Sequence, residues 1–161
     1  MIEIIIMRHG HALSADEDPE RGLSPAGRSD TARVARFLAE AGVAVDRIQH
    51  SGKKRAAETA EILREKISGK PVVERRRGLS PTDSVEEIAS ELESLEENVA
   101  LVGHLPHLNL LLVKLLDSPG APEFGTSTAV HLRRKSSGWE LVALYQPRSS
   151  SSSSSSSKPK K

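Results

Sequence analysis

The sequence predicts an α/β fold, namely a three-layer αβα sandwich whose central sheet is mostly parallel and ends in an antiparallel C-terminal hairpin. Short apolar runs alternate with helical patterns along most of the chain, and such alternation places helices on both faces of a parallel sheet. Near the C-terminus, Thr128–Arg133 and Trp139–Tyr145 alternate apolar and polar residues. They flank Ser137-Gly138, a pair typical of a hairpin turn.

The first strand and the first helix have clear signals. Residues 2–7 hold a run of isoleucines, which predicts a buried strand. The polar, acidic stretch Ser14–Arg21 predicts a loop. A helix then begins with Ser24 as its N-cap and Pro25 at the first helical position, and Gly42 is expected to end it.

The middle of the chain alternates weaker strands with amphipathic helices. Val45–His50 predicts a second strand, and residues 53–67 predict a second helix with one apolar face. Val72-Val73 predicts a short third strand. Ser84–Leu95 predicts a third helix, for which Asp83 or Ser84 is the expected N-cap.

The last strand–helix pair leads to the hairpin and then to an unusual C-terminus. Val99–Val102 predicts an all-apolar strand that ends on Gly103-His104, and Pro106 begins a fourth helix with a leucine-rich face. Residues 1–147 are therefore assigned to one domain. Residues 148–161 hold nine consecutive serines followed by lysines and a proline, a composition that predicts a flexible tail.

Composition excludes several classes of function. The chain has no cysteine, which rules out disulfides, thiolate nucleophiles and cysteine-bound metals. Only 2% of its residues are aromatic and its net charge is +1, so neither stacking on bases nor a large basic field favours nucleic acid. The longest apolar run, Ile4–Met7, is too short to span a membrane and no signal peptide precedes it. We expect a cytoplasmic protein.

Three predicted strands end in residues suited to phosphate. The first ends on Arg8 and His9, the second on His50-Ser51 with Arg55 in the next helix, and the fourth on Gly103-His104. Ligands of open α/β sheets bind beyond the carboxyl ends of the strands, so these side chains are expected to converge. Arginine presents a planar fork to phosphate oxygens, and histidine can attack phosphorus or carry a proton.

Four segments share their order and spacing with a known family. They read Arg8-His9-Gly10, Leu23-Ser24-Pro25-Ala26-Gly27, Ser51-Gly52-Lys53-Lys54-Arg55-Ala56-Ala57-Glu58-Thr59-Ala60 and Gly103-His104-Leu105-Pro106. Over nearly all of the chain before the serine run, the sequence resembles the histidine phosphatase superfamily, and within it the small SixA-type phosphohistidine phosphatases. The resemblance implies a phosphoglycerate mutase-like fold.

The resemblance also implies an activity and a set of site residues. His9 would be the nucleophile that forms a transient phosphohistidine, while Arg8, Arg55 and His104 hold the phosphoryl oxygens. Ser51 and Leu105, which belong to the same motifs, are further candidates for substrate binding. The implied enzyme is a phosphohistidine phosphatase that needs no metal or other cofactor. Its implied partner is a phosphohistidine-bearing signalling or phosphotransfer protein, with neither nucleic acid nor membrane involved.

The chain departs from larger members of the superfamily where they place a general acid. The segment after the third strand reads Gly78-Leu79-Ser80-Pro81-Thr82-Asp83, without the Glu of those enzymes, and the residue after Arg-His-Gly is His11. Both departures point away from a sugar-phosphate mutase. They leave four candidates for the proton donor: Asp83, Glu17, Asp18 and His11.

Other interpretations of the same residues remain open. A metal site could use the histidine pairs His9-x-His11 and His104-x-x-His107, although the neighbouring arginines would repel a dication. The alternatives to a protein phosphohistidine phosphatase are a small-molecule phosphomonoesterase and a non-catalytic phosphate-binding module. The triplet Arg75–Arg77 is expected to be an exposed basic turn, with an acidic protein substrate as its other interpretation.

Overall fold

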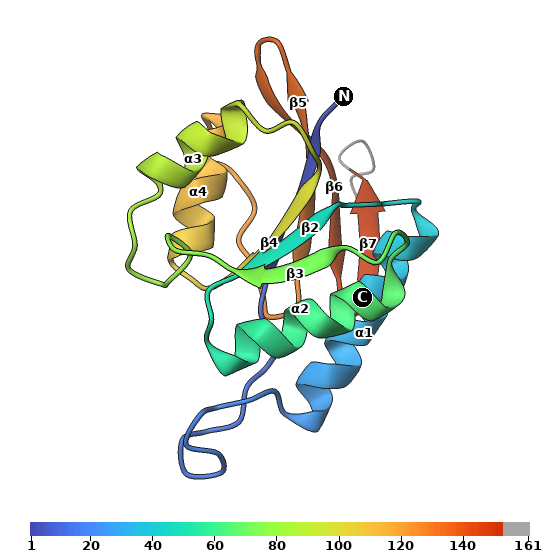
Figure 1. Ribbon diagram of the computed structural model, residues 1–161, viewed down its shortest axis with the longest axis vertical. Helices are drawn as coiled ribbons and strands as arrows, with labels where there is room; N and C mark the ends of the chain where they lie inside the picture. The colour runs from blue at the N-terminus through green and yellow to red at the C-terminus, as the bar shows by residue number, and fades with distance from the viewer. Residues whose placement is uncertain (153–161) are drawn as a thin grey trace.

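A seven-stranded sheet in the order β3-β2-β4-β1-β5-β6-β7 forms the centre of the computed structural model, which describes residues 1–152 (Figure 1). The strands are β1 (Glu3–Arg8), β2 (Arg47–His50), β3 (Val72–Arg75), β4 (Val99–Gly103), β5 (Ala129–Lys135), β6 (Gly138–Gln146) and β7 (Ser149–Ser152). The helices are α1 (Pro25–Glu40), α2 (Lys54–Lys66), α3 (Glu86–Glu93) and α4 (His107–Leu116). Strands β1 to β4 pair in parallel and the last three pair antiparallel, which confirms the predicted fold class.

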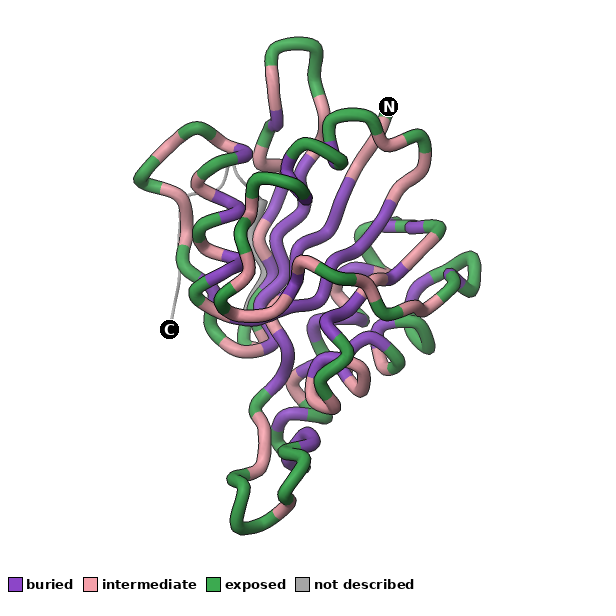
Figure 2. Tube along the Cα trace, turned by 60° about the vertical axis from the view of Figure 1, so that its left-hand side comes forward, coloured by how far each residue is buried: buried purple, intermediate pink, exposed green. Residues whose placement is uncertain are grey.

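Alternating side chains of β1 explain why helices cover both faces of the sheet. Ile5 and Met7 pack into one apolar cluster with the inner faces of α1 and α2. Ile4 and Ile6 point the other way, into a second cluster with α3 and α4. The purple core of Figure 2 follows these central strands, which are buried on both sides as in other parallel sheets.

The start of α1 forms as predicted and brings the helix close to the segment after β1. Ser24 caps the helix by accepting a hydrogen bond from the Gly27 amide at 3.0 Å. A Cβ at Gly27 would collide with the carbonyl oxygen of His11, so only glycine allows this close packing. The Leu-Ser-x-x-Gly segment therefore fixes the helix against the loop that follows His9.

Two predicted element starts are wrong by two residues. The second strand begins at Arg47 instead of Val45. The third helix begins at Glu86, with Val85 at the cap position and no capping side chain. The Ser84 hydroxyl still accepts a hydrogen bond from the Glu86 amide at 3.1 Å, whereas Asp83 accepts one from the Ser80 amide and closes the preceding turn.

The C-terminal hairpin is confirmed, and the chain continues into one more strand. Lys135 pairs with Gly138, so the turn residues are Ser136 and Ser137, one position before the predicted pair. Ser149–Ser152 pair with the outer edge of β6 as β7, where a flexible tail was expected. The reason is that an edge strand offers free backbone groups, which any sequence can pair with. The rest of the expected tail, residues 153–161, lies outside the described residues.

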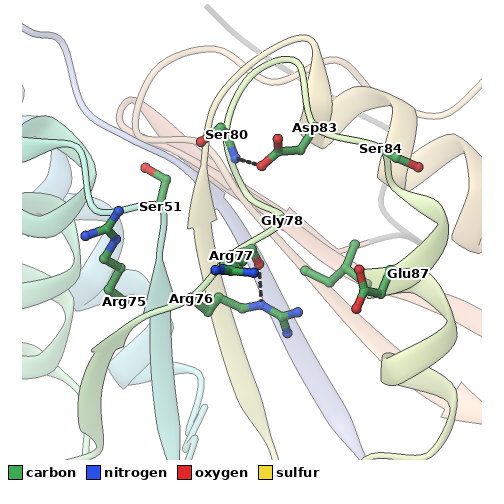
Figure 3. A pocket seen from close by; sticks show the side chains of 10 residues that line it. Ser51, Arg75, Arg76, Arg77, Gly78, Ser80, Asp83, Ser84 and Glu87 are labelled. Atoms are coloured by element: carbon green, nitrogen blue, oxygen red, sulfur yellow. Dashed lines mark hydrogen bonds between the residues drawn. The ribbon is translucent and has the colours of Figure 1, made fainter.

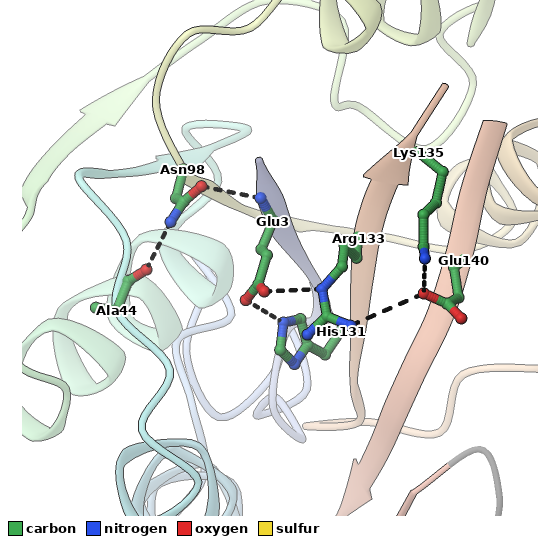
Figure 4. Close-up of polar contacts among 7 residues, drawn as sticks. All are labelled: Glu3, Ala44, Asn98, His131, Arg133, Lys135 and Glu140. Carbon is green, nitrogen blue, oxygen red and sulfur yellow. Dashed lines mark hydrogen bonds and ion pairs between the residues drawn. The ribbon is translucent and has the colours of Figure 1, made fainter. Parts of the chain in front are cut away.

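A polar cluster ties down the end of the sheet where β1 begins (Figure 4). The Glu3 carboxylate accepts hydrogen bonds from His131 at 2.8 Å and Arg133 at 3.0 Å, and its amide donates to Asn98 at 2.9 Å. These contacts join β1, β5 and the turn before β4. They fix the strands at the end of the sheet opposite to the end where Arg8 and His9 lie. Within residues 1–152, no helix has the length and hydropathy needed to cross a membrane.

Candidate active site

The carboxyl ends of β1, β2 and β4 bring the predicted residues together. Arg8 pairs with Gly103 in the parallel ladder, and the His9 amide donates to the Gly103 carbonyl at 3.1 Å. His50 is in register with Val102 on the other side of β4. Ser51, His9 and His104 each come directly after one of these strand ends, so the segments meet at one edge of the sheet, as expected from their order.

His9 and His104 form the centre of the site. Their ring centroids are 4.9 Å apart with the planes inclined by 52°. Only 8% of His9 and 2% of His104 is exposed. His104 Nε2 makes a 2.6 Å hydrogen bond with the Ser51 hydroxyl, which also accepts from the Lys53 amide at 3.3 Å. Ser51 therefore holds the orientation of His104.

The backbone fixes which nitrogen of His9 is free. His9 Nδ1 lies 2.7 Å from the carbonyl oxygen of Gly10. A carbonyl only accepts hydrogen bonds, so the neutral ring carries its hydrogen on Nδ1 and keeps its lone pair on Nε2. This arrangement leaves Nε2 as the atom able to attack an electrophile.

Both histidines are neutral over the physiological pH range. Burial, together with the charges of Arg55, Arg8 and Arg21, lowers the pKa of His9 to about 4 against the opposing Gly10 hydrogen bond. Burial also lowers the pKa of His104 to about 3, with His9 and Arg55 adding to the effect. The charged side chains with the largest effects on the pKa of His9, Arg55, Arg8 and Arg21, are thus all cations.

The guanidinium groups around His9 have donors to spare. Arg8 Nη1 donates to the Phe124 carbonyl at 3.1 Å, while its buried Nε has no partner among the described residues. Burial lowers the pKa of Arg8 and also that of Arg55, which the charge of Arg21 lowers further. His104 Nδ1 is likewise buried without a partner in that part of the chain. Buried donors beside several positive charges favour an anion.

Several supporting residues were missed at the sequence level. Thr59 accepts a hydrogen bond from the Gly10 amide at 3.0 Å, and the Ser127 amide donates to the His9 carbonyl at 3.1 Å. The Ser127 hydroxyl in turn lies 2.9 Å from that of Thr31. Thr59 could have been found from the sequence, because it belongs to the motif around Arg55. Arg21 could also have been found, as a cation just before the Leu-Ser-Pro helix start. No sequence pattern points to Ser127, Thr31 or the Phe124 carbonyl.

Two of the four candidate proton donors already accept hydrogen bonds or form an ion pair. Glu17 accepts a hydrogen bond from the Ser14 amide at 2.9 Å, and this contact lowers its pKa. Asp18 accepts from the Gly22 amide at 2.8 Å and pairs with Lys54 at 3.0 Å, which lowers its pKa as well. Both carboxyl groups are ionised at neutral pH and stabilise the loop, so neither is suited to donate a proton.

The remaining candidates lie at the margin of the site. The ring of His11 is 2.8 Å from the Ser24 hydroxyl at the start of α1. Asp83 accepts from the Ser80 amide at 2.9 Å and lines a cavity that also reaches Ser51. Leu105, predicted beside the phosphate, packs partly buried against the cluster under α3 and α4.

The competing metal interpretation receives no support from the side chains. The two predicted histidine pairs are split, since His11 contacts Ser24 whereas His107 is fully buried in the core. Among residues 1–152 no group of three or more histidine or carboxylate side chains has a geometry that could hold a metal ion.

The buried neutral histidines predict that the fold loses stability in acid. The unfolded chain has ordinary histidine pKa values of about 6.5. Between that value and the folded values of about 4 and 3, the unfolded state binds protons that the folded state does not. The free energy of unfolding should therefore be level above pH 6.5 and fall below it, by up to about 1.4 kcal/mol per pH unit for each histidine. Urea titrations at pH 7 and pH 5 measure this loss.

The matched variant is His9→Ala combined with His104→Ala, which removes both groups. It should unfold with a weaker dependence on pH over the same range. An identical slope in the variant and the wild-type protein would assign the acid sensitivity to other groups.

Comparisons with known proteins point to one superfamily. A sequence model of the histidine phosphatase superfamily (branch 1) matches residues 4–80. Phosphohistidine phosphatase SixA of Escherichia coli (strain K12) is 28% identical over 142 residues, which is 85% of this chain and 88% of that protein. The structure of the protein histidine phosphatase SixA complexed with tungstate has a TM-score of 0.80 at 27% identity, covering 91% of this chain and 97% of the other. A phosphoserine phosphatase mutant from Entamoeba histolytica shares the fold, with a TM-score of 0.68, 16% identity and coverages of 91–98% in the two related structures.

Proposed function

Because this chain belongs to the histidine phosphatase superfamily (branch 1), we propose that it removes phosphate from histidine side chains of proteins through a covalent intermediate on His9. The observation that carries the proposal is the environment of His9. Its ring is buried and neutral, Nε2 has no hydrogen-bond partner among residues 1–152, and the charged groups with the largest effect on it are three arginines. A nucleophile and an anion site thus coincide.

The reaction takes two displacement steps. In the first, Nε2 of His9 attacks phosphorus, a new N–P bond forms, and the bond from phosphorus to the substrate's imidazole nitrogen breaks. In the second, water attacks the phosphorus on His9, releases inorganic phosphate and restores the free ring. Phosphoryl transfer depends mainly on positioning and on stabilising charge on three equatorial oxygens. We assign this stabilisation to Arg8 and Arg55, whose charges act on His9, and to His104, whose ring lies beside it.

The leaving group explains why phosphohistidine suits this site. An alkoxide leaves only with strong acid assistance, whereas an imidazole departs readily and its second ring nitrogen takes up a proton near neutral pH. The carboxylates predicted as donors, Glu17 and Asp18, are held as anions in their loop. Because Glu17 and Asp18 cannot protonate the leaving group, a histidine nucleophile surrounded by arginines favours a substrate whose phosphorus is bonded to nitrogen over one whose phosphorus is bonded to an alkoxide oxygen.

The similarity to SixA supports the same substrate class. That relative is named a phosphohistidine phosphatase, and the match extends over 85% of this chain and 88% of SixA. We extend the proposal to the partner, a phosphohistidine-bearing signalling or phosphotransfer protein.

The test compares substrates on one enzyme preparation. We expect turnover of a phosphohistidine-bearing protein domain to exceed that of phosphoserine and sugar phosphates by at least about 100-fold in kcat/KM, with activity unchanged by exhaustive chelation. Rapid quench at neutral or alkaline pH should trap phosphate on His9. Preferential turnover of a phosphate monoester would instead identify a small-molecule phosphatase. Phosphate binding without any phosphoenzyme would identify a binding module.

A further inference from the structure

A cavity of about 370 Å³ opens beside the candidate active site (Figure 3). Ser51 forms part of its wall, and the same hydroxyl makes the hydrogen bond to His104 Nε2. The cavity is therefore separated from the catalytic histidines by one side chain. A part of the substrate that binds in this cavity would therefore lie close, along the substrate, to its phosphorylated residue.

Arg75 at the end of β3 and Arg76 and Arg77, which follow it, line one side of this cavity. Arg76 is paired with Glu91 at 2.9 Å, but within residues 1–152 no carboxylate lies within ion-pairing distance of Arg75 or Arg77. The Arg75 side chain lies directly over Gly52, where an added Cβ would be 2.6 Å from Arg75 Nε. Glycine at position 52 thus makes room for this guanidinium beside Ser51.

The opposite side of the cavity carries acidic and hydroxyl groups. Figure 3 shows Asp83 and Glu87 across the cavity from the arginines; Ser84 also lines this side, with its hydroxyl pointing away from them. These carboxylates would repel a continuous polyanion such as a nucleic acid strand. A peptide with a few carboxylates fits better, since each can reach a guanidinium while the rest of the chain passes the serines.

We propose that this cavity is a docking subsite for acidic residues that flank the phosphohistidine of the protein substrate. The inference rests on the proposed function and adds the chemistry by which the enzyme selects among phosphohistidine proteins. Arg75 and Arg77 bind the flanking carboxylates, and His9 reaches the phosphoryl group on the far side of Ser51.

The experiment uses two synthetic peptides that each carry one phosphohistidine, flanked by aspartates in one and by asparagines in the other. Wild-type enzyme should show a higher kcat/KM for the aspartate peptide. In the double variant Arg75→Gln/Arg77→Gln, the ratio of kcat/KM between the two peptides should fall about tenfold, because two charge-assisted contacts are lost. The control Arg33→Gln/Arg36→Gln, on the exposed side of α1, removes two charges elsewhere and should leave the ratio unchanged.

A second measurement separates this inference from the proposed function. Fluorescence anisotropy follows binding of the unphosphorylated aspartate peptide to the wild-type protein and to the double variant at low salt. Weaker binding by the variant supports the subsite even if neither phosphopeptide is hydrolysed, an outcome that would refute only the proposed function. Equal binding, or a kcat/KM ratio that the double substitution does not change, would overturn the subsite.

Discussion

Replacing His9 with alanine is expected to lower phosphatase turnover by about 10⁴- to 10⁶-fold, the range seen when an enzyme loses its covalent nucleophile. The substitution removes Nε2 of His9, which carries the lone pair because Nδ1 is bound to the Gly10 carbonyl. The site should still bind an anion, because Arg8, Arg55 and His104 remain. Steady-state kinetics measure the turnover, phosphoenzyme trapping tests whether the intermediate is lost, and calorimetric titration with tungstate measures the anion binding.

The control for His9→Ala is His131→Gln, which changes a histidine at the other end of the sheet. His131 binds Glu3 at 2.8 Å, and the amide of glutamine can replace that hydrogen bond. This variant should retain wild-type turnover. Turnover by His9→Ala within about tenfold of the wild-type rate would end the covalent mechanism proposed for His9.

The part of the site that the sequence predicts is the part that follows directly from strand order. Arg8-His9 and Gly103-His104 each come after an all-apolar run, and neighbouring parallel strands bring such ends together. Arg55 follows the strand beside β4, so its placement needed only the helix that starts there. In each case a few adjacent residues determine where the side chain lies.

The part that could not be predicted depends on contacts between distant segments. The carbonyl that anchors Arg8 belongs to Phe124, 116 positions away in a segment with no strand or helix. Any residue type has such a carbonyl, so the sequence holds no signal for it. The Gly10 carbonyl that selects the tautomer of His9 is adjacent in the sequence, but it too is a backbone group that any residue type supplies. The sequence offers Glu17 and Asp18 as candidate proton donors because the contacts that hold them as anions are mostly with backbone amides, which leave no sequence pattern.

The crowding of cations at this edge indicates a site that is selected for function over stability. Arg8, Arg21 and Arg55 all act on the pKa of His9, and Arg21 also lowers the pKa of Arg55. Such repulsion destabilises the folded protein, and on the proposed function a bound phosphoryl group is expected to relieve it. Phosphate should therefore raise the stability of the wild-type protein, which links binding directly to folding.

Replacing Arg55 with alanine is expected to lower kcat/KM by about 10²- to 10³-fold, the usual effect of removing one fixed donor from a transition-state site. Arg55 lies in the first turn of α2 and is half-buried, so its charge acts on His9 and His104 at short range. Arg55→Lys should recover part of the loss, since it restores the charge without the planar fork. Kinetics with one phosphohistidine peptide compare the three proteins.

Thermal stability decides whether Arg55 acts on the substrate or on the fold. Its guanidinium forms no ion pair with the described carboxylates and is opposed by Arg21, so Arg55→Ala should unfold at or above the wild-type temperature. Lys66→Gln, an exposed change at the other end of α2, is the matched control and should leave both activity and stability unaltered. If Arg55→Ala instead loses activity in proportion to a lowered unfolding temperature, Arg55 is a structural residue. Loss of activity in a protein of unchanged or higher stability places the guanidinium on the phosphoryl group.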